Sequence, residues 1–256
     1  MGDLGRPRML TLRRASERHH QAGGGVEVWS TFKSSGTDLD GLEEGFGALE
    51  GFSEGQLSPG SQPWPHDDHE AEVITYVAEG AVVYSDSEGR SGVMQAGEFG
   101  YATIVKGVRY SETNASHSHL ALVFRIQLRP PSVEIDLIRE RKRFSAAERR
   151  SHLRAIAATD GRAGSLRVRQ EAIVYSGLLE TGQHVVHELG SGRMAWLHVV
   201  RGEGALADLI LGEGDGVGLA DARALAFTAR ESTEVLVVDV EEPPQVDWNT
   251  DQLARR

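Results

Sequence analysis

Apolar residues in this chain come in short segments that are rich in β-branched side chains and separated by glycine-bearing turns. Segments 72–77 and 81–84 are examples, with the turn Asp86-Ser87-Glu88-Gly89 after the second. Few segments have the 3.6-residue period of an amphipathic helix, whereas β-branched segments bounded by glycine are typical of strands. The pattern predicts an all-β protein.

The expected strands form two groups. Those of the first half are 26–29, 72–77, 81–84, 91–94, 101–105, 108–112 and 120–128, with a glycine-rich polar stretch from about residue 30 to 65. Those of the second half are 166–168, 172–178, 184–189, 194–200, 204–207, 224–228 and 235–240. Hairpins that follow one another at this spacing predict a barrel or jelly roll.

A break separates the two halves. Arg129-Pro130-Pro131 cannot continue a strand ladder, because proline lacks the N–H donor. The charged segment that follows contains Ser145 and Glu148 at the spacing of a capping box. We therefore expect a connector over 133–162 with one short helical turn, although a charged loop without a helix fits the pattern equally well.

The second half repeats the first in two places. Segment 199–204 is similar to 76–81, and segment 211–216 is similar to 94–99. A weak internal repeat of this kind predicts two barrels of like topology. The expected layout is an N-terminal extension (1–9), a first barrel (10–132), the connector, a second barrel (163–242) and a polar tail (243–256).

Composition excludes several classes of function. The 256 residues carry a formal net charge of -11, with pI ≈ 5.4, which argues against nucleic-acid binding. The chain has no cysteine, so disulfides and thiolate sites are excluded. No apolar run approaches the roughly 18 residues that cross a bilayer, and no secretory signal follows the basic start. We expect a cytoplasmic protein, and a monomer.

Two motifs carry potential metal ligands two positions apart. These are His66 with Asp68, and Tyr110 with Glu112. Side chains two apart on a strand point to the same face, so the two pairs, on neighbouring strands of one barrel, would gather four donors around one ion. Glu112 inside a barrel must face either an ion or a hydrogen-bond donor such as Tyr110 or Arg109, because an unpaired buried carboxylate is costly.

Other residues leave alternatives open. His69 has the opposite parity to His66, but a local bulge would turn it toward the site and make the two histidines the nitrogen pair. Glu72 shares the face of His66 and is expected to orient a ligand by a hydrogen bond. The histidines of the second half, His184, His187 and His198, lack the two-residue pairing and a carboxylate partner. The second barrel is therefore expected to be structural.

The order and spacing of several motifs resemble the pirin family of bicupins. They are Leu12-Arg13-Arg14-Ala15, residues 72–80, Tyr84-Ser85-Asp86-Ser87, Ala96-Gly97-Glu98-Phe99, residues 107–116 and Gly164-Ser165-Leu166. The resemblance implies two tandem cupin barrels packed face to face, with one mononuclear iron-type metal in the N-terminal barrel. It places the family's ligand positions at His66, Asp68, Tyr110 and Glu112, of which only His66 and Glu112 match the family in residue type.

The altered ligand set has its own chemistry. One nitrogen and three oxygens suit Fe(III), Mn(II) or Mg(II) better than Cu(I) or Zn(II). Tyr110 could alternatively over-fill the site, or replace the ion by donating to Glu112 or Asp68.

The resemblance implies quercetinase activity or regulation through a protein partner, so three functions are open. The first is a metal-dependent, quercetinase-like dioxygenase that acts on a small aromatic substrate, with Glu112 as the catalytic base. The second is a non-catalytic regulator that binds a protein partner. The third is a metal-free enzyme that uses Tyr110 as an acid–base group.

Overall fold

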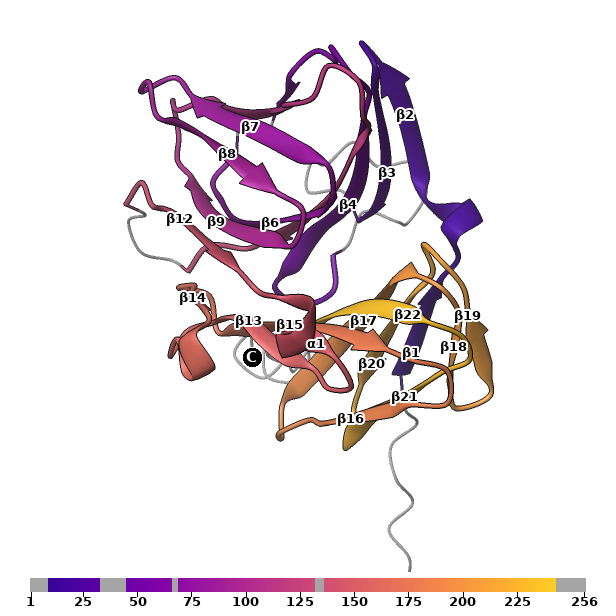
Figure 1. The fold of residues 1–256 in the computed structure, drawn as a ribbon. Helices are drawn as coiled ribbons and strands as arrows, with labels where there is room; N and C mark the ends of the chain where they lie inside the picture. The colour runs from indigo at the N-terminus through magenta and orange to yellow at the C-terminus, as the bar shows by residue number, and fades with distance from the viewer. Residues whose placement is uncertain (1–8, 33–44, 66–68, 132–135, 243–256) are drawn as a thin grey trace, which may run out of the picture.

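The chain folds into two β-barrels packed against each other (Figure 1). The structure is a computed structural model, and it describes residues 9–32, 45–65, 69–131 and 136–242. Each barrel combines a seven-stranded sheet with a four-stranded sheet. The expected all-β fold with two barrels is therefore confirmed.

The N-terminal barrel occupies the upper half of Figure 1. Its large sheet has the order β12-β9-β6-β11-β4-β3-β2, and its small sheet has the order β5-β10-β7-β8. In chain order these strands are β2 (His19–Gly23), β3 (Val26–Phe32), β4 (Leu49–Leu57), β5 (Trp64–Pro65), β6 (Ala71–Glu79), β7 (Ala81–Asp86), β8 (Ser91–Gln95), β9 (Glu98–Ile104), β10 (Tyr110–Asn114), β11 (Ala121–Leu128) and β12 (Arg139–Arg143).

The C-terminal barrel has the sheet orders β1-β20-β17-β22-β15-β13-β14 and β16-β21-β18-β19. Its strands are β1 (Met9–Arg13), β13 (Arg154–Ala158), β14 (Leu166–Arg167), β15 (Ala172–Leu179), β16 (His184–Glu188), β17 (Arg193–Arg201), β18 (Gly204–Leu206), β19 (Leu209–Leu211), β20 (Gly216–Ala220), β21 (Ala224–Ala229) and β22 (Thr233–Glu241). The 3-10 turns η1 (Ala15–Glu17) and η2 (Arg162–Gly164) lie between strands.

The internal repeat extends to the strand register. Val77 on β6 and Val199 on β17 each precede a register shift, and each backbone carbonyl accepts from a later glycine, Gly97 at 2.9 Å and Gly214 at 2.8 Å. Three residues beyond each valine, Gly80 and Gly202 turn the chain at φ 71° and 81°, a conformation that glycine adopts without a Cβ clash. The two barrels can therefore be compared position by position.

Strand β4 is the main difference from the sequence-based expectation, which described this stretch as polar and glycine-rich. It lies between β11 and β3 in the large sheet and is mostly buried. Its low hydrophobicity has two causes. Gly55 makes room for the Trp64 ring, and the buried carboxylate of Glu54 binds Arg18 at 2.7 Å.

The outer strands also differ from the expected domain boundaries. β1 pairs with β20 of the C-terminal barrel, although 10–132 was expected to be one barrel. The expected connector, 133–162, contains β12, which pairs with β9, and β13, which pairs with β15. Between these two strands is α1 (Ala146–Arg149), and its capping box joins Ser145 and Glu148. Of the two alternatives for the connector, the short helical turn is therefore correct.

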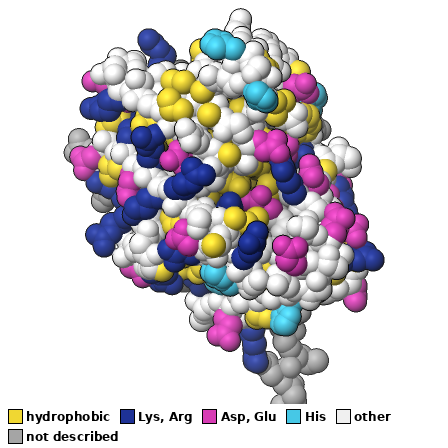
Figure 2. All heavy atoms as spheres, in the orientation of Figure 1, with side chains coloured by type: hydrophobic (Ala, Val, Ile, Leu, Met, Phe, Trp, Pro, Cys, Tyr) yellow, Lys and Arg dark blue, Asp and Glu magenta, His cyan; other side chains and the backbone are white. Residues whose placement is uncertain are grey.

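Charged side chains lie along the β12 edge of the N-terminal barrel. In Figure 2 basic side chains gather on this side of the molecule, although the chain is acidic as a whole. The sequence of β12 is Arg-Glu-Arg-Lys-Arg, and charges of this kind prevent an edge strand from pairing with another chain. No helix in the described part of the chain is long and apolar enough to cross a membrane.

The largest apolar cluster lies between the barrels, not inside either one. Its members from both barrels include Phe52, Tyr76, Phe124, Trp196 and Leu236. Smaller clusters fill the interiors of the two barrels. Alternate residues of one strand thus serve different cores: on β11, Phe124 faces the other barrel, while Val123 faces the interior of its own.

Candidate functional site

Glu112 is the central residue of the site. It lies on β10, is 0% exposed, and sits opposite Trp64 of β5 and Tyr84 of β7. Tyr110, two residues earlier on the same strand, is also buried. The structure thus brings these two sequence-predicted residues together on one inward face. His66 and Asp68, the other two, lie outside the described residues.

Both oxygens of the Glu112 carboxylate are engaged by protein donors. Oε1 accepts from the Thr75 hydroxyl at 2.9 Å and from the Tyr110 hydroxyl at 3.2 Å. Oε2 lies 2.8 Å from both Nε and Nη2 of Arg125. A carboxylate offers about four acceptor positions on its two oxygens. These four contacts therefore match its capacity.

Arg125 reaches Glu112 from β11 and binds a second strand as well. Its Nη1 donates to the backbone carbonyl of Pro65 at 3.0 Å, and its Nη2 donates to that of Trp64 at 2.8 Å. The guanidinium carbon stacks 3.3 Å from the centre of the Trp64 ring. The side chain is 5% exposed. One buried cation therefore connects β11 with β5 and β10.

Sequence reasoning missed Arg125 and Thr75. It expected Glu112 to face an ion or a donor, and proposed Tyr110 or Arg109. Tyr110 is one of the donors, but Arg109 is exposed and the charged partner is Arg125. A usable signal was present, because Arg125 stands in the apolar strand 121–128 at the parity of the interior residue Val123.

The expected role of Glu72 is wrong. Its carboxylate faces the other barrel and accepts the backbone N–H groups of Arg169, at 3.0 Å, and Gln170, at 3.1 Å. Burial raises the pKa of this carboxyl, while the hydrogen bonds from Gln170 and Arg169 oppose that shift. Glu72 therefore links the two barrels, and these hydrogen bonds involve neither Tyr110 nor Glu112, the two described ligand candidates.

His69, the alternative nitrogen ligand, has a buried Nε2 that finds no hydrogen-bond partner among the described residues. It is absent from the hydrogen bonds and ion pairs of Glu112 described above.

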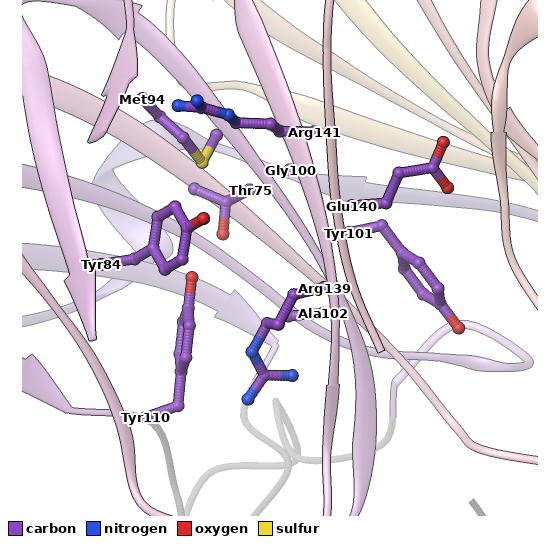
Figure 3. A pocket seen from close by; sticks show the side chains of 10 residues that line it. All are labelled: Thr75, Tyr84, Met94, Gly100, Tyr101, Ala102, Tyr110, Arg139, Glu140 and Arg141. Atoms are coloured by element: carbon purple, nitrogen blue, oxygen red, sulfur yellow. The ribbon is translucent and has the colours of Figure 1, made fainter. Parts of the chain in front are cut away.

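A small cavity adjoins Tyr110 (Figure 3). Tyr84, Tyr110 and Thr75 point toward one another there, whereas Tyr101 and Glu140 point to the other side of the ribbon. The Tyr110 ring stacks on Tyr84, with ring centres 6.2 Å apart, and also faces the Arg139 guanidinium at 4.7 Å. The cavity volume is about 10 Å³, which is space for one water molecule.

The described residues do not fit the metal that the family pattern implies. An ion at Glu112 would need an oxygen lone pair that Arg125, Thr75 and Tyr110 already use. Burial, followed by the charge of Glu112, raises the pKa of Tyr110 well above its usual value of 10. The described part of the chain also contains no cluster of three or more histidine, aspartate or glutamate side chains that could hold an ion.

The C-terminal barrel has apolar residues at the corresponding positions. Register places Leu197 and Val237 where the N-terminal barrel has Thr75 and Arg125. Phe227 likewise stands at the position of Glu112, and Leu225 at that of Tyr110. All four belong to the interior cluster of the second barrel. The polar site is thus specific to the first barrel.

One expectation about the second barrel was wrong, because His187 does have a carboxylate partner. Its Nε2 lies 2.6 Å from Oδ2 of Asp239, and Arg193 donates to Oδ1 of the same carboxylate at 2.7 Å. The partner is 52 residues away along the chain, so only strand pairing reveals it.

Comparisons with known proteins agree over both barrels. The family model described as Pirin matches residues 21–128, and the one described as quercetinase C-terminal cupin domain matches residues 155–240. Quercetin 2,3-dioxygenase of Escherichia coli K12 is 31% identical over 92% of this chain and 100% of its own length. A pirin-like protein of Caulobacter vibrioides is 27% identical over 76% and 84%.

A solved structure gives the same result. The crystal structure of the bacterial pirin YhhW from Escherichia coli in complex with nickel(II) matches with a TM-score of 0.82 and 30% identity. The match covers 92% of this chain and 100% of that one.

Proposed function

Because the chain belongs to the pirin family of paired-cupin proteins, we propose that it is a non-catalytic member, which acts by binding a partner protein and not by oxygen chemistry. The proposal rests on the surroundings of Glu112. Both oxygens of its carboxylate accept hydrogen bonds from protein donors, which are Thr75, Tyr110 and Arg125. In a quercetinase-like reaction this carboxylate would take the proton of the flavonol.

A general base must come within about 2.6–3.2 Å of the proton that it removes. Glu112 is fully buried, and the cavity of about 10 Å³ that Tyr110 lines has room for one water molecule. A partner protein binds to an outer surface and requires no internal cavity. The geometry therefore favours surface recognition over turnover of an aromatic substrate.

Quercetin turnover tests the proposal directly. The purified protein, incubated with quercetin, oxygen and either Fe(II), Mn(II) or Ni(II), should consume flavonol no faster than the buffer with the same metal. The proposal fails if the protein turns quercetin over and Glu112→Gln abolishes that turnover while Ser111→Ala retains it. Ser111 is a matched control, because it neighbours Glu112 on β10 and contacts Ser85 instead of the site.

Ligand binding gives a second test that is independent of metal. Trp64 lies against Arg125, so an aromatic ligand that enters the barrel should quench tryptophan fluorescence. We expect no saturable quenching by quercetin. Saturable binding of one flavonol per chain, lost in Tyr110→Ala, would contradict surface recognition as the mode of action.

A flavonol dioxygenase is the second candidate. It is favoured by the similarity to the Escherichia coli quercetin 2,3-dioxygenase over that protein's full length. The buried Nε2 of His69, which has no hydrogen-bond partner within the described ranges, favours it as well. About one bound metal per chain together with Glu112-dependent turnover would support it.

A further inference from the structure

We infer that the Arg125 guanidinium replaces the metal ion of this family as the cation of the N-terminal barrel. Arg125 has this role whether the protein works through a partner or through metal-free chemistry.

The contacts of Glu112 support the replacement of the metal ion by Arg125. Glu112 stands at a ligand position of the family pattern, and its nearest positive charge is the guanidinium, with both Nε and Nη2 at 2.8 Å from Oε2. A metal ion would crosslink strands around the barrel interior. Arg125 makes the same kind of link, because it starts on β11 and binds the carboxylate on β10 and two carbonyls on β5.

The positive charges of a metal ion and of Arg125 would repel each other at this carboxylate. Glu112 is fully buried and needs one compensating positive charge. Arg125 supplies it permanently, because a guanidinium keeps its proton in proteins. A divalent ion on the same carboxylate would lie a few ångströms from that fixed charge, where the low dielectric strengthens the repulsion. An ion at Glu112 would therefore bind more tightly once Arg125 is removed.

The C-terminal barrel indicates that this polar arrangement is not a general need of the fold. The positions that correspond to Thr75, Arg125 and Glu112 hold Leu197, Val237 and Phe227 there, all of them apolar. The buried Glu112, with its donors Arg125, Thr75 and Tyr110, is therefore a charged centre specific to the first barrel. Thr75 and Arg125 are direct cross-strand partners, which explains how both reach one carboxylate.

Metal analysis of the intact protein is the first arm of the test. The untagged wild-type chain is equilibrated with Fe(II), Mn(II) or Ni(II), desalted and analysed for metal. We expect less than about one-tenth of an equivalent, and a melting temperature that the metal or a chelator shifts by less than about 1 °C. About one equivalent per chain, lost in Glu112→Gln but kept in Ser111→Ala, would overturn the inference.

The second arm restores the family ligands in two backgrounds. The pair Asp68→His and Tyr110→His is introduced once with Arg125 retained and once with Arg125→Met. We expect metal binding, and a rise in melting temperature of about 5 °C on adding metal, only where Arg125 has been removed. Equal metal binding in both backgrounds would overturn the inference, and so would its absence from both. Circular dichroism first establishes that each variant is folded, with Arg125→Gln as the substitute where Arg125→Met is not.

These arms separate the inference from the proposed function. Quercetin turnover by a metal-free wild-type protein would refute the non-catalytic proposal but leave the arginine in the place of the ion. About one equivalent of metal per chain, bound through Glu112 but without turnover, would refute the role of Arg125 and leave the non-catalytic proposal standing.

Discussion

Glu112 and Arg125 show how the environment of a single residue decides its chemistry. A buried ion pair contributes little net stability compared with an apolar pair of the same size, but removing one partner leaves an uncompensated charge. Thr75 and Tyr110 complete the set of donors to the carboxylate. The pair is therefore expected to act as a unit in mutagenesis.

We predict that Arg125→Met lowers the free energy of unfolding by about 3–5 kcal/mol, because Glu112 stays buried without its cation. The double variant Arg125→Met with Glu112→Gln should recover about 2 kcal/mol of that loss, since no charge remains. Urea unfolding of the wild type, both single variants and the double variant measures the coupling. Additive losses would mean that the two side chains do not stabilise each other.

His198 gives a prediction about pH. Its ring lies between Phe52 and Phe124 at the barrel interface, and neither ring nitrogen finds a hydrogen-bond partner among the described residues. Burial lowers the pKa of His198 well below 6.5, and the positive charge of Arg18 lowers it further. The folded protein therefore resists a proton that the unfolded chain accepts below about pH 6.5.

The contribution of His198 to stability is thus complete above that pH and is lost as the pH falls. Relative to His198→Phe, the wild type should lose about 1.4 kcal/mol for each pH unit below 6.5. Chemical unfolding of both proteins at pH 5, 6, 7 and 8 measures the difference in slope. Parallel profiles for the two proteins would contradict the prediction.

At the scale of elements, β4 positions the site although it carries none of its donors. Gly55 on β4 has no side chain, and the Trp64 ring occupies the space: a Cβ there would come 2.3 Å from Cζ3 of that ring. Trp64 in turn stacks on Arg125 and gives it a backbone carbonyl. A glycine in the large sheet therefore fixes the place of the internal cation.

We predict that Gly55→Ala costs about 1–3 kcal/mol, because it pushes Trp64 away from Arg125. Gly23→Ala is the matched control, since Gly23 lies on the exposed strand β2 and a Cβ there meets nothing within 4 Å. The control should change stability by less than about 0.5 kcal/mol. Thermal unfolding and tryptophan fluorescence measure both effects, and an unshifted emission in Gly55→Ala would argue against the displacement.

At the scale of the whole molecule, a buried polar network joins the two barrels. Nη1 of Arg149, at the end of α1, donates to the Tyr76 hydroxyl at 3.0 Å, to Ser176 at 3.1 Å and to Glu234 at 2.8 Å. Tyr76 belongs to the first barrel, while Ser176 and Glu234 belong to the second. β1 also crosses from the N-terminus into the second barrel. The barrels are therefore expected to unfold together.

Arg149→Met should lower stability by about 2–4 kcal/mol, because it leaves the largely buried Glu234 without its cation. Arg150→Met, one residue later on the exposed surface, is the control and should change stability by less than about 0.5 kcal/mol. Calorimetry measures the change. A single transition supports joint unfolding, and two separated transitions in the wild type would refute it.

The sequence by itself determined the all-β class, the two barrels and the inward placement of Tyr110 and Glu112. These features depend on local information: the alternation of side chains along a strand and the glycine turns between strands. The capping box of α1 is local in the same way, since Ser145 and Glu148 lie three residues apart.

Only the tertiary structure decided what Glu112 faces. Its partner Arg125 is 13 residues away along the chain, and Thr75 is 37 residues away. The role of Glu72, the His187–Asp239 pair and the crossing of β1 likewise depend on which strands become neighbours. Parity along a strand tells which way a side chain points, but the residue that it meets is set by strand order and register, which join segments distant in the sequence.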